Sequence, residues 1–234
     1  MNNFWKGLFF VRKCVVCGKA LPDAGENTVF CADCFRNYRK LRADVCAHCG
    51  KTENACRCVP KKLWGKIGFS AHLFTFYGPL SRTIVYTAKL RNLPYLQRFL
   101  AHELSDLIRE ATRDDFSDFT VTFAPRNPRR VAVCGFDQAE VLARLTAERL
   151  HLPFARMFRH TYFSSLQKRL NAAEREINAN NSYFLREDFV PQTKKLLIFD
   201  DVITTGSTLS TLVSLAKLAG FREVSIVCIA KASV

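Results

Sequence analysis

From residue 69 onward, short apolar runs alternate with segments that have a helical pattern. Four apolar runs have the length of buried strands and lie at residues 69–77, 118–124, 196–199 and 224–229. Four other segments repeat apolar residues every three or four positions, as amphipathic helices do, and lie at residues 80–90, 94–108, 137–150 and 207–219. The alternation predicts an α/β fold with an open, mostly parallel sheet and flanking helices.

The chain before residue 60 has a different pattern, in which closely spaced cysteines take the place of long apolar runs. We therefore predict three parts: a small cysteine module at residues 1–59, a short basic linker at residues 60–68, and the α/β domain at residues 69–234. Residues 159–182 are polar and only weakly periodic, which predicts either a long mobile loop or a marginal helix.

The string from Leu196 to Thr208 carries the most specific chemical signal. Its apolar run ends in two adjacent carboxylates, Asp200 and Asp201, and a short loop then opens the last helical pattern. The loop residues are Thr204, Thr205, Gly206, Ser207 and Thr208. Free N–H groups and the positive end of the helix dipole favour an anion at such a loop, and Gly206 lets the backbone approach it closely.

The paired acids suit the other end of the same ligand. Carboxylates accept hydrogen bonds from ribose hydroxyls, and their charge would stabilise cationic character at an anomeric carbon during bond cleavage. The string therefore predicts a site for a ribose that carries a phosphate on its 5-carbon. The alternative is a strand end with a solvated acidic pair and an ordinary helix cap, but the whole thirteen-residue string favours the ligand.

This string resembles the signature of type I phosphoribosyltransferases, which bind 5-phosphoribosyl 1-pyrophosphate (PRPP). The resemblance implies that Asp200 and Asp201 contact the ribose hydroxyls and are the candidate catalytic residues, while residues 204–208 wrap the 5-phosphate. It also implies that Mg²⁺ accompanies PRPP, held mainly by the oxygens of the ligand and by water.

A PRPP site also needs cations for its pyrophosphate, and a basic loop follows the predicted strand at 118–124. The arginines of this loop are Arg126, Arg129 and Arg130. Arginine makes bidentate contacts with phosphate, and Arg126 is the candidate ligand, although a solvated basic turn explains any single one equally well. Candidates for a flexible loop that closes over the site are Lys168, Arg169 and Arg175.

Eight of the ten cysteines lie within the first 58 residues, in four closely spaced pairs. The pairs are Cys14 and Cys17, Cys31 and Cys34, Cys46 and Cys49, and Cys56 and Cys58. Two such pairs complete one tetrahedral Zn²⁺ site, so four pairs predict two zinc ions in a double zinc-ribbon module. We expect the pairs to combine sequentially along the chain; an interleaved arrangement and an iron–sulfur site are the alternatives.

The composition of the chain is basic, and its apolar runs are short. The formal net charge of +14 favours polyanionic partners such as nucleic acid or a highly phosphorylated ligand, although it also fits an ordinary basic protein. No apolar run is long enough to span a membrane, and the first apolar stretch is too short for a signal peptide. We therefore expect a cytoplasmic protein.

Aromatic and basic residues interleave in the cysteine module and the linker. This mixture can stack bases and neutralise phosphates, as single-stranded nucleic acid requires. The candidate nucleic-acid-binding residues are Arg12, Lys13, Arg36, Arg39, Lys40, Lys61 and Lys62. The alternative is that the aromatic side chains pack the module against the main domain.

Further blocks resemble the ComF family, the competence-associated branch of phosphoribosyltransferase-like proteins. Residues 124–130 read Ala-Pro-Arg-Asn-Pro-Arg-Arg, and residues 135–139 read Gly-Phe-Asp-Gln-Ala, where Asp137 replaces the usual asparagine. Residues 88–91, Ala-Lys-Leu-Arg, resemble a lysine-bearing stretch of the family, and N-terminal cysteine pairs are common in it. The resemblance covers nearly the whole chain and implies handling of single-stranded DNA during natural transformation, with other competence proteins as candidate partners.

Two other functions stay open at this stage. The site would also serve an active phosphoribosyltransferase that acts on an unknown base or amine, or a regulatory protein that senses PRPP. The sequence shows no motif for a particular acceptor.

Overall fold

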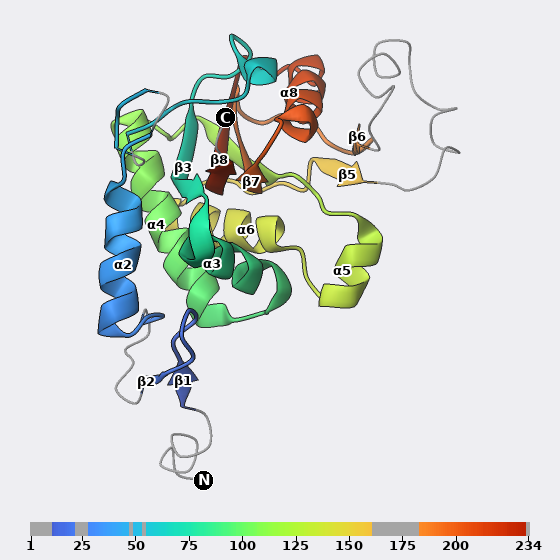
Figure 1. Ribbon diagram of the computed structural model, residues 1–234. Helices are drawn as coiled ribbons and strands as arrows, with labels where there is room; N and C mark the ends of the chain where they lie inside the picture. The colour runs from blue at the N-terminus through green and yellow to red at the C-terminus, as the bar shows by residue number, and fades with distance from the viewer. Residues whose placement is uncertain (1–10, 22–27, 47–48, 53–54, 161–182, 233–234) are drawn as a thin grey trace.

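A four-stranded parallel sheet forms the centre of the computed structural model, which describes residues 11–21, 28–46, 49–52, 55–160 and 183–232 (Figure 1). The strands are β3 (Ser70–Phe76), β4 (Phe119–Phe123), β7 (Lys195–Ile203) and β8 (Glu223–Ala232). They lie in the order β3–β8–β7–β4, and each neighbouring pair is parallel. The predicted open parallel α/β sheet is therefore confirmed.

Helices cover both faces of this sheet, because alternate residues of its central strands point to opposite sides. In β7, Leu197 and Phe199 belong to one apolar cluster, and Leu196 and Ile198 belong to the other. The helices of the first cluster are α2 (Ala32–Ala43), α3 (Gly78–Leu90), α4 (Pro94–Thr112) and α6 (Gln138–Leu150). Helix α8 (Ser207–Leu218) and the 3₁₀ helix η1 (Lys61–Leu63) pack in the second cluster.

The four predicted helices in the α/β domain are confirmed as α3, α4, α6 and α8. Asp137 caps α6, since its Oδ1 accepts a hydrogen bond from the backbone N–H of Ala139 at 3.0 Å. Strand β7 is longer than its apolar run, because Val202 and Ile203 are also buried and pair with β8. The two carboxylates therefore belong to the strand itself and not to a loop that follows it.

Helix α2 of the cysteine module packs into the same apolar cluster as α3, α4 and α6. Tyr38 is buried there, with its ring against Phe30 and Phe99. Its hydroxyl donates to Glu103 Oε2 at 2.8 Å, and Arg42 Nη1 lies 2.6 Å from the same oxygen. The aromatic residue Tyr38 thus packs the module against the rest of the protein, while the proposed domain boundary at residues 59–69 stays a prediction.

Helices α2 and η1 and five other short elements have no counterpart in the sequence prediction. The other five are β1 (Arg12–Lys13), β2 (Ala20–Leu21), α5 (Pro128–Cys134), β5 (Phe158–His160) and β6 (Tyr183–Leu185). Strands β5 and β6 pair with each other in antiparallel register, outside the main sheet. None of the helices in the described part of the chain combines the length and the hydropathy that a membrane span needs.

Candidate functional site

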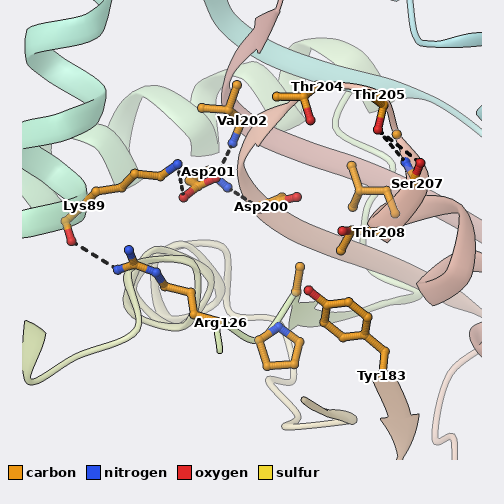
Figure 2. A pocket seen from close by; sticks show the side chains of 14 residues that line it. Lys89, Arg126, Tyr183, Asp200, Asp201, Val202, Thr204, Thr205, Ser207 and Thr208 are labelled. Carbon is orange, nitrogen blue, oxygen red and sulfur yellow. Dashed lines mark hydrogen bonds and ion pairs between the residues drawn. The ribbon is translucent and has the colours of Figure 1, made fainter. Parts of the chain in front are cut away.

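A cavity of about 280 Å³ opens at the carboxyl ends of β4 and β7 (Figure 2). The lining side chains of interest come from α3, the loop after β4, β6, β7 and the start of α8. They are Lys89, Arg126, Tyr183, Asp200, Asp201, Thr204, Thr205, Ser207 and Thr208, and Gly206 completes the loop. Open parallel sheets bind their ligands at this edge, so the predicted acids and the predicted loop face one space.

Asp200 and Asp201 line the cavity and are both half-buried. The backbone N–H of Asp201 donates to Asp200 Oδ1 at 2.7 Å, and that of Val202 donates to Asp201 Oδ1 at 2.7 Å. Burial and the neighbouring charge of Asp201 raise the pKa of Asp200 well above its ordinary value. A ligand that donates hydrogen bonds here would relieve this unfavourable charge, and ribose hydroxyls are such donors.

Lys89, near the end of α3, contributes a cation that was not among the predicted site residues. Its Nζ lies 2.8 Å from Asp201 Oδ2, and its carbonyl oxygen accepts a hydrogen bond from Arg126 Nη1 at 3.1 Å. Two positive groups therefore lie beside the acid pair. The sequence signal for Lys89 was the Ala-Lys-Leu-Arg stretch, which resembles a lysine-bearing block of the family.

Asp137 holds the loop that carries Arg126. The backbone N–H of Arg126 donates to Asp137 Oδ2 at 2.8 Å, while the other oxygen of Asp137 caps α6. Burial raises the pKa of Asp137, which accepts these bonds within the protein interior. Arg129 and Arg130 are exposed on α5 and are not among the described residues that line the cavity. Only Arg126 of the three arginines therefore faces the acid pair.

The loop before α8 has the geometry of an anion site. Gly206 has a φ of 73°, a left-handed conformation that favours glycine, and it directly precedes the first residue of α8. The hydroxyl oxygens of Thr205 and Ser207 lie 3.1 Å apart at the mouth of the cavity. Amide and hydroxyl donors thus gather at a helix N-terminus, opposite the acid pair in Figure 2.

Tyr183 closes the side of the cavity near Thr208, and no sequence pattern predicts this residue as part of the site (Figure 2). It is the first residue of β6, and burial raises the pKa of its phenol, so the group stays neutral and can donate a hydrogen bond. The predicted flexible-loop residues Lys168, Arg169 and Arg175 lie outside the described residues.

The candidate nucleic-acid-binding residues lie on two sides of the sheet. Arg36, Arg39 and Lys40 are exposed on α2, and Lys13 is exposed on β1. The guanidinium of Arg12 lies 5.7 Å from the centre of the Tyr95 ring. Lys61 and Lys62 lie on η1, on the side of α8, where Lys62 Nζ donates to Ser207 Oγ at 2.7 Å.

The eight N-terminal cysteines form two groups of four. Cys14, Cys17, Cys31 and Cys34 form the first group, and Cys46, Cys49, Cys56 and Cys58 form the second. Within each group all sulfur atoms lie within 4.8 Å of one another. This sequential grouping is the one expected from the spacing of the pairs.

The sulfur separations fit a tetrahedral metal site. Cys17 Sγ lies 3.6 Å from Cys31 Sγ, and Cys49 Sγ lies 3.7 Å from Cys56 Sγ. Four sulfurs placed about 2.3 Å from a central Zn²⁺ stand roughly 3.8 Å apart. Gly18 and Gly50 both have positive φ and donate to the carbonyls of Cys14 and Cys46 at 2.9 Å, so the two knuckles share one geometry. Both groups therefore fit Zn²⁺.

Lys231 connects the second cysteine group to the sheet. It is buried in β8, and its Nζ lies 3.3 Å from Cys56 Sγ and 3.4 Å from Cys46 Sγ. An ammonium so close to two sulfurs stabilises their thiolate forms, which are the forms that bind a metal.

Three curated proteins resemble the chain along almost its whole length. Competence protein ComFC of Streptococcus pneumoniae is 24% identical over 91% of this chain and 96% of its own length. Competence protein F of Haemophilus influenzae is 26% identical over 96% of this chain and 99% of its own. DNA utilization protein YhgH of Escherichia coli is 26% identical over 90% of this chain and 94% of its own. The chain is ComF-like. No protein-family model matches it.

Solved structures match the ComF-like chain only in part. An adenine phosphoribosyltransferase is 16% identical over 61% of the chain and 73% of its own, with a TM-score of 0.40. An allosteric regulatory enzyme of purine biosynthesis is 16% identical over 62% of the chain but only 30% of its own, with a TM-score of 0.41. The description of the fold as an open parallel α/β sheet therefore rests on the strands and helices of the chain itself.

Proposed function

We propose that this ComF-like protein binds PRPP together with Mg²⁺ and handles single-stranded DNA during uptake, as a cytoplasmic protein that works with other competence proteins. The observation that carries the proposal is that the acid pair and residues 204–208 line one cavity. PRPP presents ribose hydroxyls and a 5-phosphate at the corresponding ends. Carboxylates accept from the hydroxyls, and the amides at the helix N-terminus bind the phosphate.

The pyrophosphate would lie beside Lys89 and Arg126. Both side chains lie across the cavity from Ser207, on the far side of the acid pair (Figure 2). Their positive charge suits the pyrophosphate, and Mg²⁺ would bind mainly to its oxygens and to water. Each cysteine group would hold one structural Zn²⁺.

The surface of α2 supports the proposed role in handling DNA. Arg36, Arg39 and Lys40 are exposed on it, and Phe35 beside them has 44% of its surface exposed. A single-strand site has two components: cations that neutralise the phosphates, and an aromatic ring that stacks on the bases. The names of the relatives, which refer to competence and DNA utilization, agree with this role.

Calorimetric titration with PRPP and Mg²⁺ tests the site directly. Wild type should bind, and the double variant Asp200→Asn/Asp201→Asn should lose roughly a hundredfold in affinity, because two charge-assisted hydrogen-bonding groups are removed. The matched control is Asp114→Asn/Asp115→Asn, which neutralises two adjacent exposed acids just after α4. Equal affinity of both double variants would remove the proposed site.

A second function is transfer of phosphoribose to a base or amine. Asp200 and Asp201 favour it, because their charge would stabilise an oxocarbenium-like centre in the same cavity. Pyrophosphate release with a panel of bases and amines would establish an enzyme. Binding of PRPP without any release would leave the DNA-handling role or a PRPP-sensing regulatory role.

A further inference from the structure

Lys62, from the predicted linker, lies on the loop that is proposed to bind the 5-phosphate. Its Nζ lies 2.7 Å from Ser207 Oγ, although the two residues are 145 positions apart in the chain. We propose that Lys62 is a ligand of the 5-phosphate, so that the segment after the cysteine module completes the site that residues 204–208 begin. This inference rests on the proposed function.

The backbone around Lys62 is held firmly against α8. Leu63 is fully buried in the apolar cluster that contains α8, and the carbonyl oxygen of Lys62 accepts a hydrogen bond from Ser210 Oγ at 3.3 Å. One residue farther on, Trp64 Nε1 donates to the carbonyl of Val59 at 3.0 Å. Helix η1 therefore keeps the stem of Lys62 next to the first turn of α8.

Gly206 makes this close contact sterically feasible. A Cβ atom built on Gly206 would lie 3.3 Å from both Leu63 Cδ1 and Pro60 Cβ, which is tighter than ordinary contact. A side chain at residue 206 would therefore push the loop and η1 slightly apart. Lys62 is exposed, and this fit keeps its ammonium at the loop, where Nζ contacts Ser207 Oγ.

The charge balance of the cavity explains why a cation is needed there. The loop residues 204–208 offer amide and hydroxyl donors but no positive charge. The two cations among the described lining residues, Lys89 and Arg126, lie beside the acid pair, where Lys89 already pairs with Asp201. A 5-phosphate carries close to two negative charges at neutral pH. Lys62 supplies a compensating positive charge beside residues 204–208, where this phosphate is proposed to bind.

Ser207 can connect the two groups. A hydroxyl accepts and donates hydrogen bonds at the same time, so Ser207 Oγ can accept from Lys62 while it donates to a phosphate oxygen. The flexible four-carbon stem of Lys62 also allows the ammonium to contact the phosphate directly. Both arrangements make binding depend on the charge of residue 62.

Titration of ribose 5-phosphate into the full-length, zinc-loaded protein tests this inference. Lys62→Gln should weaken binding about tenfold or more, because it removes a charge-assisted contact, and Lys62→Arg should restore much of it. The matched control is Lys66→Gln, which removes the same charge from the same segment. Lys66 Nζ donates to Ser210 Oγ at 3.2 Å, farther along α8, so this control should stay within about twofold of wild type.

The pH dependence separates a direct phosphate contact from a structural role. Wild-type affinity should rise as the phosphate loses its second proton, near a pKa of about 6, and Lys62→Gln should show a flatter rise. Unchanged zinc content and melting temperature in Lys62→Gln would show that the fold is intact.

The outcomes distinguish a failure of the proposed PRPP-binding function from a failure of the assignment of Lys62 to the 5-phosphate. If the wild-type protein binds neither ribose 5-phosphate nor PRPP, the proposed function itself fails. If wild type binds and Lys62→Gln binds equally well, or Lys66→Gln loses as much affinity, only the assignment of Lys62 is overturned. A loss of single-stranded DNA binding in Lys62→Gln with unchanged ribose 5-phosphate affinity would assign Lys62 to the nucleic-acid surface and would also overturn it.

Discussion

At the scale of single residues, Asp200 is destabilising in the free protein. Its carboxylate is half-buried, lies next to Asp201, and has a raised pKa because of burial and that neighbouring charge. A position that is unfavourable for the fold and well placed for a ligand is typical of a binding site.

Replacing Asp200 by asparagine should therefore raise the melting temperature at pH 7 while it weakens PRPP binding. The asparagine oxygen can still accept the hydrogen bond from the N–H of Asp201, but it carries no charge. The pKa of Asp200 is higher in the folded protein than its unfolded value of about 3.9. The free energy of unfolding of the wild type therefore falls as the pH rises from the unfolded pKa to the folded pKa.

Thermal unfolding of both proteins across a pH series checks this prediction. The advantage of Asp200→Asn should grow with pH above the unfolded pKa and then level off above the folded one. A variant that is less stable than wild type at neutral pH, or an advantage that is the same at all pH values, would contradict it.

Lys89 should matter more for PRPP than for ribose 5-phosphate. It lies across the cavity from Ser207, on the side assigned to the pyrophosphate, and its ion pair with Asp201 is 2.8 Å long. We expect Lys89→Met to lower PRPP affinity about tenfold more than ribose 5-phosphate affinity, because only PRPP has the pyrophosphate. Parallel titrations measure the ratio, and equal losses for both ligands would show that Lys89 acts only through Asp201.

The sequence predicted those site residues that are contiguous in the chain. Asp200, Asp201 and the loop residues form one string with a recognisable pattern. Lys89 and Tyr183 reach the cavity, and Lys62 reaches Ser207, only through packing. Tyr183 and Lys62 have no local pattern that assigns them to the site, and Lys89 has only the resemblance of residues 88–91 to a block of the family. The same dependence on packing separates Arg126, which lines the cavity, from its exposed neighbours Arg129 and Arg130.

At the scale of secondary-structure elements, α2 has two faces with different roles. Its inner face contributes Cys34, Tyr38 and Leu41 to the core, and its outer face exposes basic side chains. The buried hydroxyl of Tyr38 and its partner Glu103 fix the helix against α4. The outer face is thus presented on a rigid element, as a binding surface requires.

Neutralising the outer face of α2 should weaken binding of single-stranded DNA in a salt-dependent way. The triple variant replaces Arg36, Arg39 and Lys40 by glutamine. Each neutralised phosphate contributes about −0.7 to the slope of log affinity against log salt, so the slope should become shallower by roughly 2.

PRPP binding by this triple variant should be unchanged, because none of the three residues is among the described residues that line the cavity. The control variant has the same change of charge. It replaces three exposed residues of α4 and α6, Arg98, Arg109 and Arg149, by glutamine. An equal change of slope in the control would mean that overall charge, and not α2, attracts DNA.

The long amphipathic helices of the α/β domain were predictable, whereas α2 in the cysteine module and the shortest elements were not. Helix α4 repeats its apolar stripe over five turns, so its pattern stands out from the surrounding sequence. Helix α5 has seven residues, none of them buried, and β5 and β6 have three residues each. Elements of this length are stabilised by their neighbours and leave no periodicity in the sequence.

At the scale of the whole molecule, the cysteine module and the segment that follows it contact the α/β domain at several places. Helix α2 enters the main core, Lys231 of β8 contacts the second cysteine group, and η1 packs on α8. The predicted linker is therefore a docked segment, not a simple spacer. Its docking depends on the fit between Leu63 and Gly206, two residues far apart in the sequence.

Removal of zinc should therefore impair the ribose 5-phosphate site as well as the module. Metal analysis should give two Zn²⁺ per chain. Stripping them with a strong chelator should lower the melting temperature and weaken ribose 5-phosphate binding at least as much as Lys62→Gln, because the segment after Cys58 loses its anchor.

Two cysteine variants serve as a matched pair for this test. Cys58→Ser should reduce the zinc content and the ligand affinity, while Cys134→Ser, outside both groups, should change neither. Full ligand affinity in the metal-free protein would show that the module and the cavity are independent.

A crystal structure of the protein with PRPP and Mg²⁺ tests the central claim most directly. We predict density for the ligand in the cavity at the ends of β4 and β7, with the ribose hydroxyls on Asp200 and Asp201 and the 5-phosphate on the amides of residues 204–208. An empty cavity with PRPP bound elsewhere, or a ligand whose 5-phosphate lies beside Lys89 and Arg126, would contradict the account.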